Sequence, residues 1–248
     1  MLTRSSLFQF RHGDHTCVFY QTEDALREVL TPFIADGLRR GERCFCAQKS
    51  HIGKRLLFDL RFLGIDTDDA INRGALEIHT EDEVYLSNGR FNPAVMVDML
   101  MSSLDDALDK GFTAFRTAGE LSWASGSKSL CTQLVDYEKL VDRCFPGKPA
   151  VGLCQYDMRV FSPALLETIV EAHRLHVSHP PNSTVFSGLT IRSGNYCSEI
   201  VADKFVHTPN YYYVVQRRQP AEVVGWGIAP SLDSASEKAE QVARDAGL

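Results

Sequence analysis

The sequence predicts an α/β protein with a parallel β-sheet covered by helices on both faces, a three-layer arrangement. Two observations predict it. Five short segments, the last ending at residue 156, are mostly near-continuous runs of apolar residues, as in strands that meet water on neither side. Amphipathic segments long enough for helices separate them, and this alternation requires parallel strands joined by right-handed crossovers.

Each element has its own signal. Strands are expected at residues 16–20 (TCVFY), 43–48 (RCFCAQ), 75–80 (ALEIHT), 113–120 (TAFRTAGE) and 150–156 (AVGLCQY), and helices at residues 22–40, 51–64, 92–111, 129–145 and 162–177. Thr22, Asn92 and Ser162 offer the side-chain oxygens that cap helix N-termini. Prolines follow the last two, at the first helical position, and Gly41 ends the first helix.

A change of pattern after residue 178 predicts a second, smaller module. The segment SHPPNST at residues 178–184 is expected to be a linker, because two prolines and small polar residues offer nothing to bury. Three segments with alternating polarity follow, as in antiparallel strands, and then a terminal helix. They are VFSGLTIRSG, YYYVVQRR, AEVVGWGIAP and SLDSASEKAEQVARDAGL. The predicted domains are therefore an α/β domain at residues 1–178 and a β-β-β-α module at residues 185–248.

Composition limits the classes of function. The chain is 44% hydrophobic and 23% charged, as in ordinary globular proteins, and its net charge of −6 gives no reason to expect nucleic-acid binding. No apolar run approaches the ~20 residues that cross a bilayer, and the first residues lack the apolar core of a signal peptide. Seven cysteines, an odd number scattered through apolar segments, indicate reduced thiols and a cytoplasmic protein.

The corner after the first strand, YQTED at residues 20–24, lacks the features that bind a triphosphate. Phosphate loops need glycines, so that backbone N–H groups can approach the phosphates, and a lysine. This corner has neither, and it places Glu23 and Asp24 at the positive end of the helix, where carboxylates stabilise by ~0.3–1 kcal/mol each. The same carboxylates would repel a triphosphate, so we do not expect ATP hydrolysis.

Covalent catalysis is not expected either. The sequence has no G-x-S-x-G elbow for a serine nucleophile. His15 and Cys17 stand two apart on a strand, so their side chains point in parallel instead of at each other, which is an awkward geometry for a base and its nucleophile. The protein is therefore predicted not to be an enzyme.

Five segments match the pattern of a known family in its order, across about residues 12–177. They are GDHTCVFY (13–20), FIADGLRRGERC (33–44), YLSNGRFNP (85–93), TAGELSWA (117–124) and CQYD (154–157). This set resembles the MEDS domain, the methanogen/methylotroph sensory domain first described in a dichloromethane-responsive repressor. The resemblance implies a degenerate RecA/KaiC-like fold without a P-loop and a non-catalytic sensor of small hydrocarbon derivatives. Unlike relatives with DNA-binding or kinase outputs, the sequence shows no such module after residue 180.

The candidate ligand-binding residues follow from the strand order. The resemblance implies that the first strand lies between the fourth and the fifth, which would bring several polar and aromatic side chains together. They are His15, Cys17, Tyr20, Glu120, Trp123, Cys154 and Tyr156. Ligands of open α/β sheets bind outside the carboxyl ends of the strands, where residues 120–123 and 154–157 lie. Tyr137 and Glu138 on the fourth helix are open candidates, although Tyr137 shares the inward apolar stripe of that helix.

The same residues allow a metal interpretation. Histidine, cysteine and glutamate suit zinc, so His15, Cys17, Glu120 and Cys154 could line a metal site. The alternative is that the two cysteines are small buried hydrophobic residues, as free cysteines usually are. The second interpretation is preferred, so no metal or cofactor is assigned.

These observations predict a ligand-sensing regulatory protein. Its expected partners are a small-molecule ligand and a separate signalling or regulatory protein, with no membrane and no direct nucleic-acid binding, and with a homodimer left open. The alternative is a protein-interaction module of an anti-sigma or kinase pathway whose pocket is vestigial. A residual nucleotide binder is the third interpretation.

Overall fold

The computed structural model describes residues 10–86, 90–173, 175–178, 188–193, 196–202, 211–218, 221–229 and 232–247. The chain divides into two compact units. One is Phe10–His173, and the other is Arg174–Leu248 together with Met1–Gln9. The sequence suggests a boundary after residue 178, whereas contacts within the fold divide the chain after His173.

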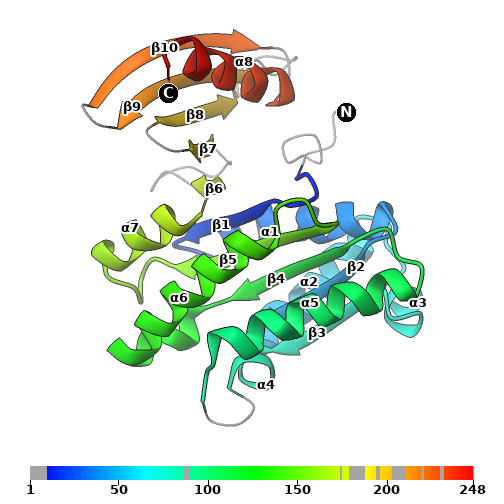
Figure 1. Ribbon diagram of the computed structural model, residues 1–248. Coiled ribbons are helices and arrows are strands. Elements are labelled where there is room, and N and C mark those ends of the chain that lie inside the picture. The colour runs from blue at the N-terminus through cyan, green and yellow to red at the C-terminus, as the bar shows by residue number, and fades with distance from the viewer. Residues whose placement is uncertain are drawn as a thin grey trace. The chain divides into compact units, whose positions relative to one another are not determined.

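The first unit contains a five-stranded, wholly parallel sheet (Figure 1). Its strands are β1 (His15–Tyr20), β2 (Arg43–Gln48), β3 (Leu76–Thr80), β4 (Phe115–Glu120) and β5 (Ala150–Asp157), and their spatial order is β1-β5-β4-β2-β3. Every residue of β1 and β5 is buried. The predicted strands and the predicted α/β class are confirmed.

The predicted position of the first strand is wrong. β1 does not lie between β4 and β5; instead β5 lies between β1 and β4 and pairs with both. β5 is the longest of the five strands and is buried throughout, as suits a strand that is paired along both edges and covered on both faces. The expectation came from the resemblance alone, because nothing in the apolar segments specifies which strand takes the inner position.

Helices cover both faces of this sheet (Figure 1). α1 (Glu23–Arg39) and α2 (Ser50–Phe62) pack together on one face, and α5 (Pro93–Asp109), α6 (Lys128–Cys144) and α7 (Pro163–Ala172) pack side by side on the other. Shorter elements complete the unit: α3 (Thr67–Asn72), α4 (Glu81–Tyr85) and the 3-10 helix η2 (Ser122–Gly126). The side chains of Thr22, Asn92 and Ser162 accept the predicted capping hydrogen bonds from backbone N–H groups.

A large hydrophobic core lies between the sheet and α5, α6 and α7. It includes Phe19 and Cys17 from β1, Leu134 and Val141 from α6, and Ile169 from α7. Because β1 and β5 pair in parallel with Cys17 opposite Cys154, the odd-numbered residues of β1 face the same core as the even-numbered residues of β5. This packing places the candidate site.

The second unit is an antiparallel sheet with a terminal helix. Its strands are β6 (Leu175–Ser178), β7 (Gly188–Ser193), β8 (Tyr196–Ala202), β9 (Tyr211–Arg218) and β10 (Ala221–Ala229), each paired with the next, and α8 (Leu232–Asp245) follows. The sequence predicts β7, β9, β10 and α8 but neither β6 nor β8. The expected fifth helix runs too far: α7 ends at Ala172, and pairing with β7 makes residues 175–178 a strand. Residues 179–184 of the predicted linker lie outside the described residues.

Candidate functional site

Four side chains with metal-binding or acid–base chemistry meet inside the core of the first unit. They are His15 on β1, Glu138 on α6, Cys154 on β5 and His173 directly after α7, and we call them the buried cluster. All four are buried, and their ligand atoms lie within 4.8 Å of one another. Two neighbouring strands of the sheet and two helices of the layer that covers it therefore bring these side chains to one point.

Glu138 is the centre of the buried cluster. Its Oε2 lies 3.0 Å from Nε2 of His15 and 3.1 Å from Nε2 of His173. Its other carboxylate oxygen accepts the hydroxyl hydrogen bond of Tyr156. The thiol of Cys154 completes the group, with Sγ 3.3 Å from Nε2 of His15.

The outer nitrogens of both histidines also face oxygen atoms. Nδ1 of His173 lies 2.8 Å from the carbonyl oxygen of Ile169, so a proton on Nδ1 would be donated there. Nδ1 of His15 lies 3.7 Å from Oδ1 of Asp142, which is partly exposed. In each ring both nitrogens are directed to oxygen atoms that accept hydrogen bonds, which favours the protonated imidazolium form.

A glycine on β5 makes room for the cluster. A Cβ atom on Gly152 would lie 3.0 Å from the ring of Phe145 and 3.3 Å from the ring of His15. Those distances are tighter than most carbon contacts, so a side chain here would move one of the two rings. The parallel register places Gly152 directly opposite His15. The glycine thus fixes where the imidazole can lie.

The surroundings shift the proton affinities of the cluster. Burial alone raises the pKa of Glu138, but the two neighbouring imidazoles more than reverse this and hold the pKa well below its usual range. Burial lowers the pKa of His173, but the interaction with Cys17 and then the charge on Glu138 outweigh it and raise the pKa to about 9. Burial, followed by the charge on Glu138, raises the pKa of the Cys154 thiol. At neutral pH the cluster therefore holds a carboxylate balanced by a protonated histidine, with a neutral thiol.

Some polar atoms of the cluster are close to a partner without forming a hydrogen bond. Oε2 of Glu138, Nε2 of His173 and Nδ1 of His15 are buried and have no aligned hydrogen-bond partner within the described part of the chain. Proteins rarely leave such atoms unsatisfied, because each costs about 1–3 kcal/mol. The arrangement is therefore costly for stability alone, which points to a function.

A second polar group lies at the carboxyl ends of the strands, on Tyr20, Lys49, Glu120, Ser122 and Asp157, and we call it the strand-end cluster. The hydroxyl of Tyr20 donates to Oε1 of Glu120 at 2.9 Å, and the backbone N–H of Ser122 approaches both carboxylate oxygens at 3.2 Å. Nζ of Lys49 lies 3.7 Å from Glu120 and 4.0 Å from Asp157. Burial, and then the charge on Glu120, raises the pKa of Tyr20.

Four rings form an aromatic cluster in the same core as the buried cluster. Trp123 stacks on Tyr85 with 5.0 Å between ring centroids and contacts Phe91 at 4.6 Å, and Phe91 meets Tyr137 edge-on at 5.7 Å. Gly119 permits this packing, because a Cβ there would lie 2.1 Å from the hydroxyl oxygen of Tyr85. The indole nitrogen of Trp123 is buried without a hydrogen-bond partner in the described residues.

The predicted site residues fall into three groups. His15 and Cys154 belong to the buried cluster, Tyr20 and Glu120 to the strand-end cluster, and Trp123 to the aromatic cluster. Tyr156 adjoins the buried cluster through Glu138. Cys17 lies opposite Cys154 and interacts with His173. Of the other two members of the buried cluster, Glu138 is only an open candidate in the sequence analysis, and His173 is not predicted at all.

The corner after β1 is closed by its own side chains. The hydroxyl of Thr22 accepts from the backbone N–H of Ala25, Oε1 of Glu23 lies 2.8 Å from the His51 ring, and Asp24 pairs with Arg27 at 2.6 Å. The start of α1 therefore carries a cap and two paired carboxylates where a phosphate-binding protein offers open N–H groups.

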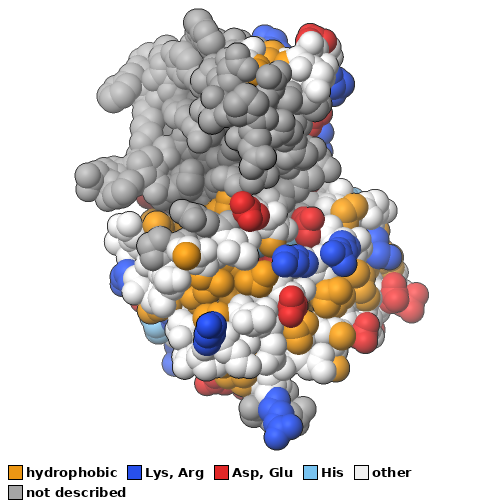
Figure 2. Space-filling view, turned by 60° about the vertical axis from the view of Figure 1, so that its left-hand side comes forward, with side chains coloured by type: hydrophobic (Ala, Val, Ile, Leu, Met, Phe, Trp, Pro, Cys, Tyr) orange, Lys and Arg blue, Asp and Glu red, His pale blue; other side chains and the backbone are white. Residues whose placement is uncertain are grey.

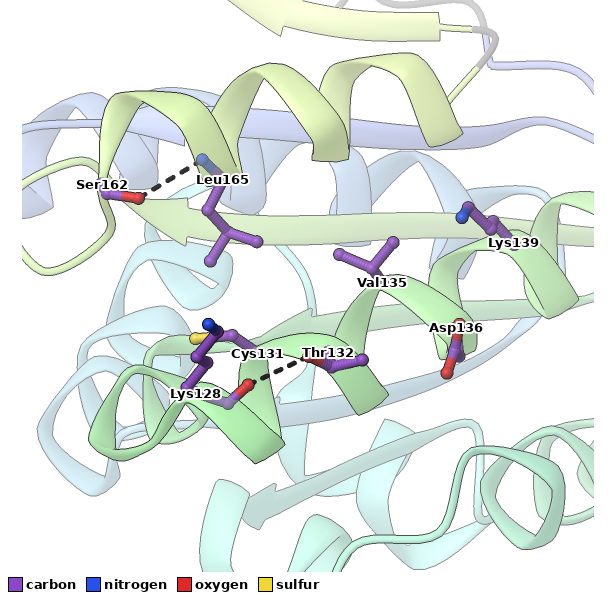
Figure 3. Close-up of a pocket in the computed structure, with 8 residues that line it drawn as sticks. All are labelled: Lys128, Cys131, Thr132, Val135, Asp136, Lys139, Ser162 and Leu165. Atoms are coloured by element: carbon purple, nitrogen blue, oxygen red, sulfur yellow. Dashed lines mark hydrogen bonds between the residues drawn. The ribbon is translucent and has the colours of Figure 1, made fainter.

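A groove on the outer side of α6 is separate from all three groups (Figure 3). It has a volume of about 540 Å³ and is lined by Lys128, Cys131, Thr132, Val135, Asp136 and Lys139 of α6 and by Ser162 and Leu165 at the start of α7. The hydrogen bonds among these residues are internal to the two helices. None of the predicted site residues lines it.

The described surface in Figure 2 is mixed in charge. Lys and Arg side chains alternate there with Asp and Glu side chains around several hydrophobic areas, and they do not form one basic stripe on this face. Within the described residues, no helix is both long and apolar enough to cross a membrane.

The fold and the closed corner define a class of protein, an α/β domain with a parallel sheet between two helical layers and no phosphate loop after its first strand. One solved structure with this architecture is the uncharacterized protein PH0321 from Pyrococcus horikoshii, solved in complex with an unknown peptide (TM-score 0.53, 7% identity, 87% of this chain and 93% of that chain). Weaker likenesses are the KaiC-like protein PH0186 from Pyrococcus horikoshii OT3 (TM-score 0.44, 11% identity, 89% and 91%) and the flagellar accessory protein FlaH from Methanocaldococcus jannaschii (TM-score 0.42, 10% identity, 88% and 90%). These likenesses concern the fold alone.

The chain belongs to the MEDS family, described as the MEthanogen/methylotroph, DcmR Sensory domain, whose family model matches residues 14–174. A curated relative is the transcriptional repressor DcmR of Methylorubrum extorquens (strain DSM 6343 / CIP 106787 / DM4), 26% identical over 170 residues. The match covers 68% of this chain and 61% of the repressor, so the chain corresponds to less than two thirds of that protein. The resemblance to the family is confirmed, and with it a sensory domain that contains all three groups of residues.

Proposed function

We propose that the first unit is a non-catalytic sensor that binds a small hydrocarbon derivative in the core between the sheet and helices α5, α6 and α7. The observation that carries the proposal is that the buried cluster and the aromatic cluster share this core. Their proximity also appears in the electrostatics, since the charge on Glu138 contributes to raising the pKa of Tyr85 and of Tyr137. Ligand sites typically combine such aromatic walls with a few convergent polar groups.

The two clusters offer complementary contacts for one small molecule. The rings of Tyr85, Phe91 and Trp123 would contact its apolar part, and Glu138 with Tyr156 would hold its polar end. Binding would change regulation only through a difference in affinity between two conformations of the protein. We expect a separate signalling or regulatory protein, or a second copy of the chain, to detect that difference in the cytoplasm, without a membrane and without direct nucleic-acid contact.

Several features support a role without catalysis. The corner at Thr22 is capped and acidic, so it favours no triphosphate. The Cys154 thiol is protonated at neutral pH, because burial and Glu138 raise its pKa, and a protonated thiol is a poor nucleophile. A thermal shift with ATP and magnesium is the direct check, and no stabilisation is expected.

Fluorescence of Trp123 can test the ligand site. The chain has two tryptophans, so Trp226→Phe leaves Trp123 as the only indole. In that background we would titrate the protein with dichloromethane, methanol and other one- and two-carbon compounds. Saturable quenching or a spectral shift with at least one compound is expected, and native mass spectrometry of freshly purified protein would show any ligand already bound.

Two matched tyrosine variants locate the binding site. Tyr156→Phe removes a hydroxyl from Glu138, and Tyr20→Phe removes a hydroxyl from Glu120 in the strand-end cluster. We expect Tyr156→Phe to weaken binding about tenfold or more, the effect of one charge-assisted hydrogen bond, and Tyr20→Phe to leave it unchanged. If Tyr20→Phe alone weakens binding, the ligand occupies the strand ends instead. If no compound binds, the protein-interaction alternative replaces the sensor.

A further inference from the structure

We propose that His15, Glu138, Cys154 and His173 bind a divalent transition-metal ion of the zinc class. The site would be tetrahedral, with two imidazole nitrogens, one carboxylate oxygen and one thiolate sulfur as ligands. This inference goes beyond the proposed sensor and does not depend on it, because a metal bound by four protein side chains needs no small-molecule ligand.

Three of the six distances between the four ligand atoms are close to those of a tetrahedral zinc site. Zinc–ligand bonds of about 2.0–2.3 Å at tetrahedral angles separate neighbouring ligand atoms by roughly 3.3–3.6 Å. Here Nε2 of His15 lies 3.0 Å from Oε2 of Glu138 and 3.3 Å from Sγ of Cys154, and Nε2 of His173 lies 3.1 Å from the same carboxylate oxygen. The other pairs lie within 4.8 Å of each other, so their side chains would move together by up to about an ångström to enclose an ion.

The atoms around the ligands have the arrangement of a metal site. Metal-binding histidines usually direct their second nitrogen to a carboxylate or a backbone carbonyl, which orients the ring. The second nitrogen of His15 faces Asp142 and that of His173 faces the Ile169 carbonyl. The carboxylate of Glu138 is similarly held by the hydroxyl of Tyr156. Glu138 and His173 thus each have an outer hydrogen-bond partner, and the second nitrogen of His15 is directed towards the Asp142 carboxylate.

The buried atoms without hydrogen bonds also support a metal site. Oε2 of Glu138 and Nε2 of His173 are completely buried, face each other and have no aligned hydrogen bond within the described residues. A simple ion pair would be expected to align a proton between them. A metal ion between the two atoms satisfies both and removes the cost of leaving them unpaired.

Charge also balances in the metal-bound form. A divalent ion carries two positive charges, and the carboxylate of Glu138 and the thiolate of Cys154 supply two negative charges, with both histidines neutral. Binding displaces the thiol proton and the proton that the histidines carry, and both protons leave to solvent. Four protein ligands leave no open position for water, so the ion would be structural instead of catalytic. A thiolate with imidazole donors favours zinc over magnesium or calcium.

Elemental analysis and cobalt substitution test the site in the full chain. The protein would be purified without a nickel column or chelators, and zinc would be measured by mass spectrometry. We expect about one equivalent of zinc per chain. After removal by a chelator, Co²⁺ alone should restore a tetrahedral visible spectrum with a thiolate-to-cobalt charge-transfer band.

Two buried cysteines provide a matched pair of variants. Cys154→Ser should lose the charge-transfer band and most of the zinc. Cys46 is also buried but lies on β2 outside the cluster, so Cys46→Ser should keep both. Asp142→Asn should keep the band and lower zinc affinity about tenfold, the usual effect of an outer partner. If Cys154→Ser does not fold, zinc protection of one thiol against a thiol reagent in the wild type gives the same information. Wild-type protein with less than about a tenth of an equivalent of zinc and no cobalt spectrum would overturn the proposal, whatever the ligand titration shows.

Discussion

Arg116 is a charged residue held in the interior of the first unit. Its guanidinium is fully buried and donates to Oε2 of Glu42 at 2.5 Å, to the Phe33 carbonyl at 3.0 Å and to Asp36 at 3.1 Å. It also lies 4.7 Å above the Phe33 ring. Its interactions tie β4 to α1 on the face of the sheet opposite the candidate site, so it should contribute to stability and not to ligand binding.

Replacing Arg116 should destabilise the protein strongly. Arg116→Met leaves Glu42 buried without its cation, and breaking a buried pair from one side typically costs about 3–5 kcal/mol. Arg40→Met is the control, because Arg40 pairs with the same Asp36 at the surface, where such a pair contributes about 0–1 kcal/mol. Urea unfolding gives both values. If both variants lower the free energy of unfolding by the same small amount, the burial of Glu42 does not depend on its ion pair with Arg116.

Asp157 predicts a specific dependence of stability on pH. Burial raises the pKa of Asp157, but hydrogen bonds from the side chain and backbone of Arg159 outweigh this and lower it. A carboxyl group whose folded pKa is depressed stabilises fully above its unfolded pKa, about 4, and loses that contribution as the pH falls through the folded pKa.

The variant Asp157→Asn isolates this contribution. The wild type should be more stable than Asp157→Asn at pH 7, and the difference should shrink below about pH 4 as the wild-type carboxyl is protonated. Melting temperatures of both proteins between pH 7 and pH 2.5 provide the measurement. A difference that stays constant over this range would show that the depressed pKa makes no contribution.

Only some of the site residues can be predicted from the sequence. His15 and Cys154 could be found, because strand-borne histidine and cysteine in apolar segments stand out. Glu138 had one signal, a carboxylate beside the inward-facing Tyr137 of an amphipathic helix, and the sequence leaves its role open. His173 had none, because its position depends on where α7 ends and how it packs against the sheet.

At the scale of elements, α1 packs on β4 at a glycine. A Cβ on Gly37 would lie 2.6 Å from Cδ and Nε of Arg116 and 2.9 Å from Sγ of Cys44. Glycine in a helix normally destabilises the fold by about 1 kcal/mol relative to alanine. The close packing of α1 on β4 must therefore offset this destabilisation. The helix can lie near the sheet only because residue 37 has no side chain.

Gly37→Ala should therefore destabilise the protein although alanine is the better helix former. The overpacking is expected to cost about 1–3 kcal/mol in the free energy of unfolding. Gly126→Ala in η2 is the control, since nothing lies within 4 Å of the added Cβ, and its effect should stay within about 0.5 kcal/mol. A Gly37→Ala variant that is more stable than wild type would show that helix and sheet are not in close contact there.

The sequence predicts the helices and strands well where residues within each segment determine its secondary structure. The five parallel strands and the caps at Thr22, Asn92 and Ser162 follow from apolar runs and capping side chains. The order of the strands does not follow from the sequence in this way, because every apolar strand would be equally stable at the centre of the sheet. β6 and β8 were missed since pairing with neighbouring strands, and not a pattern within each segment, makes them strands.

For the whole molecule, the division into two units has a testable consequence. All residues of the described hydrophobic core that surrounds the candidate site lie between Phe10 and His173. A domain of about 150 residues can bury roughly 70% of its surface, which is enough for independent stability. The buried cluster and the aromatic cluster are also complete within this range.

A fragment of residues 10–173 should therefore fold alone and retain the site. We expect cooperative thermal unfolding and a near-ultraviolet circular dichroism spectrum with the fixed aromatic signals of Trp123 and its neighbours. The full chain is the reference, and any ligand or metal bound by it should bind the fragment with similar affinity, because the second unit supplies none of the groups named in either proposal. A fragment that binds a hydrophobic dye and lacks near-ultraviolet signals would be a molten globule, and the first unit would then depend on the rest of the chain for its packing.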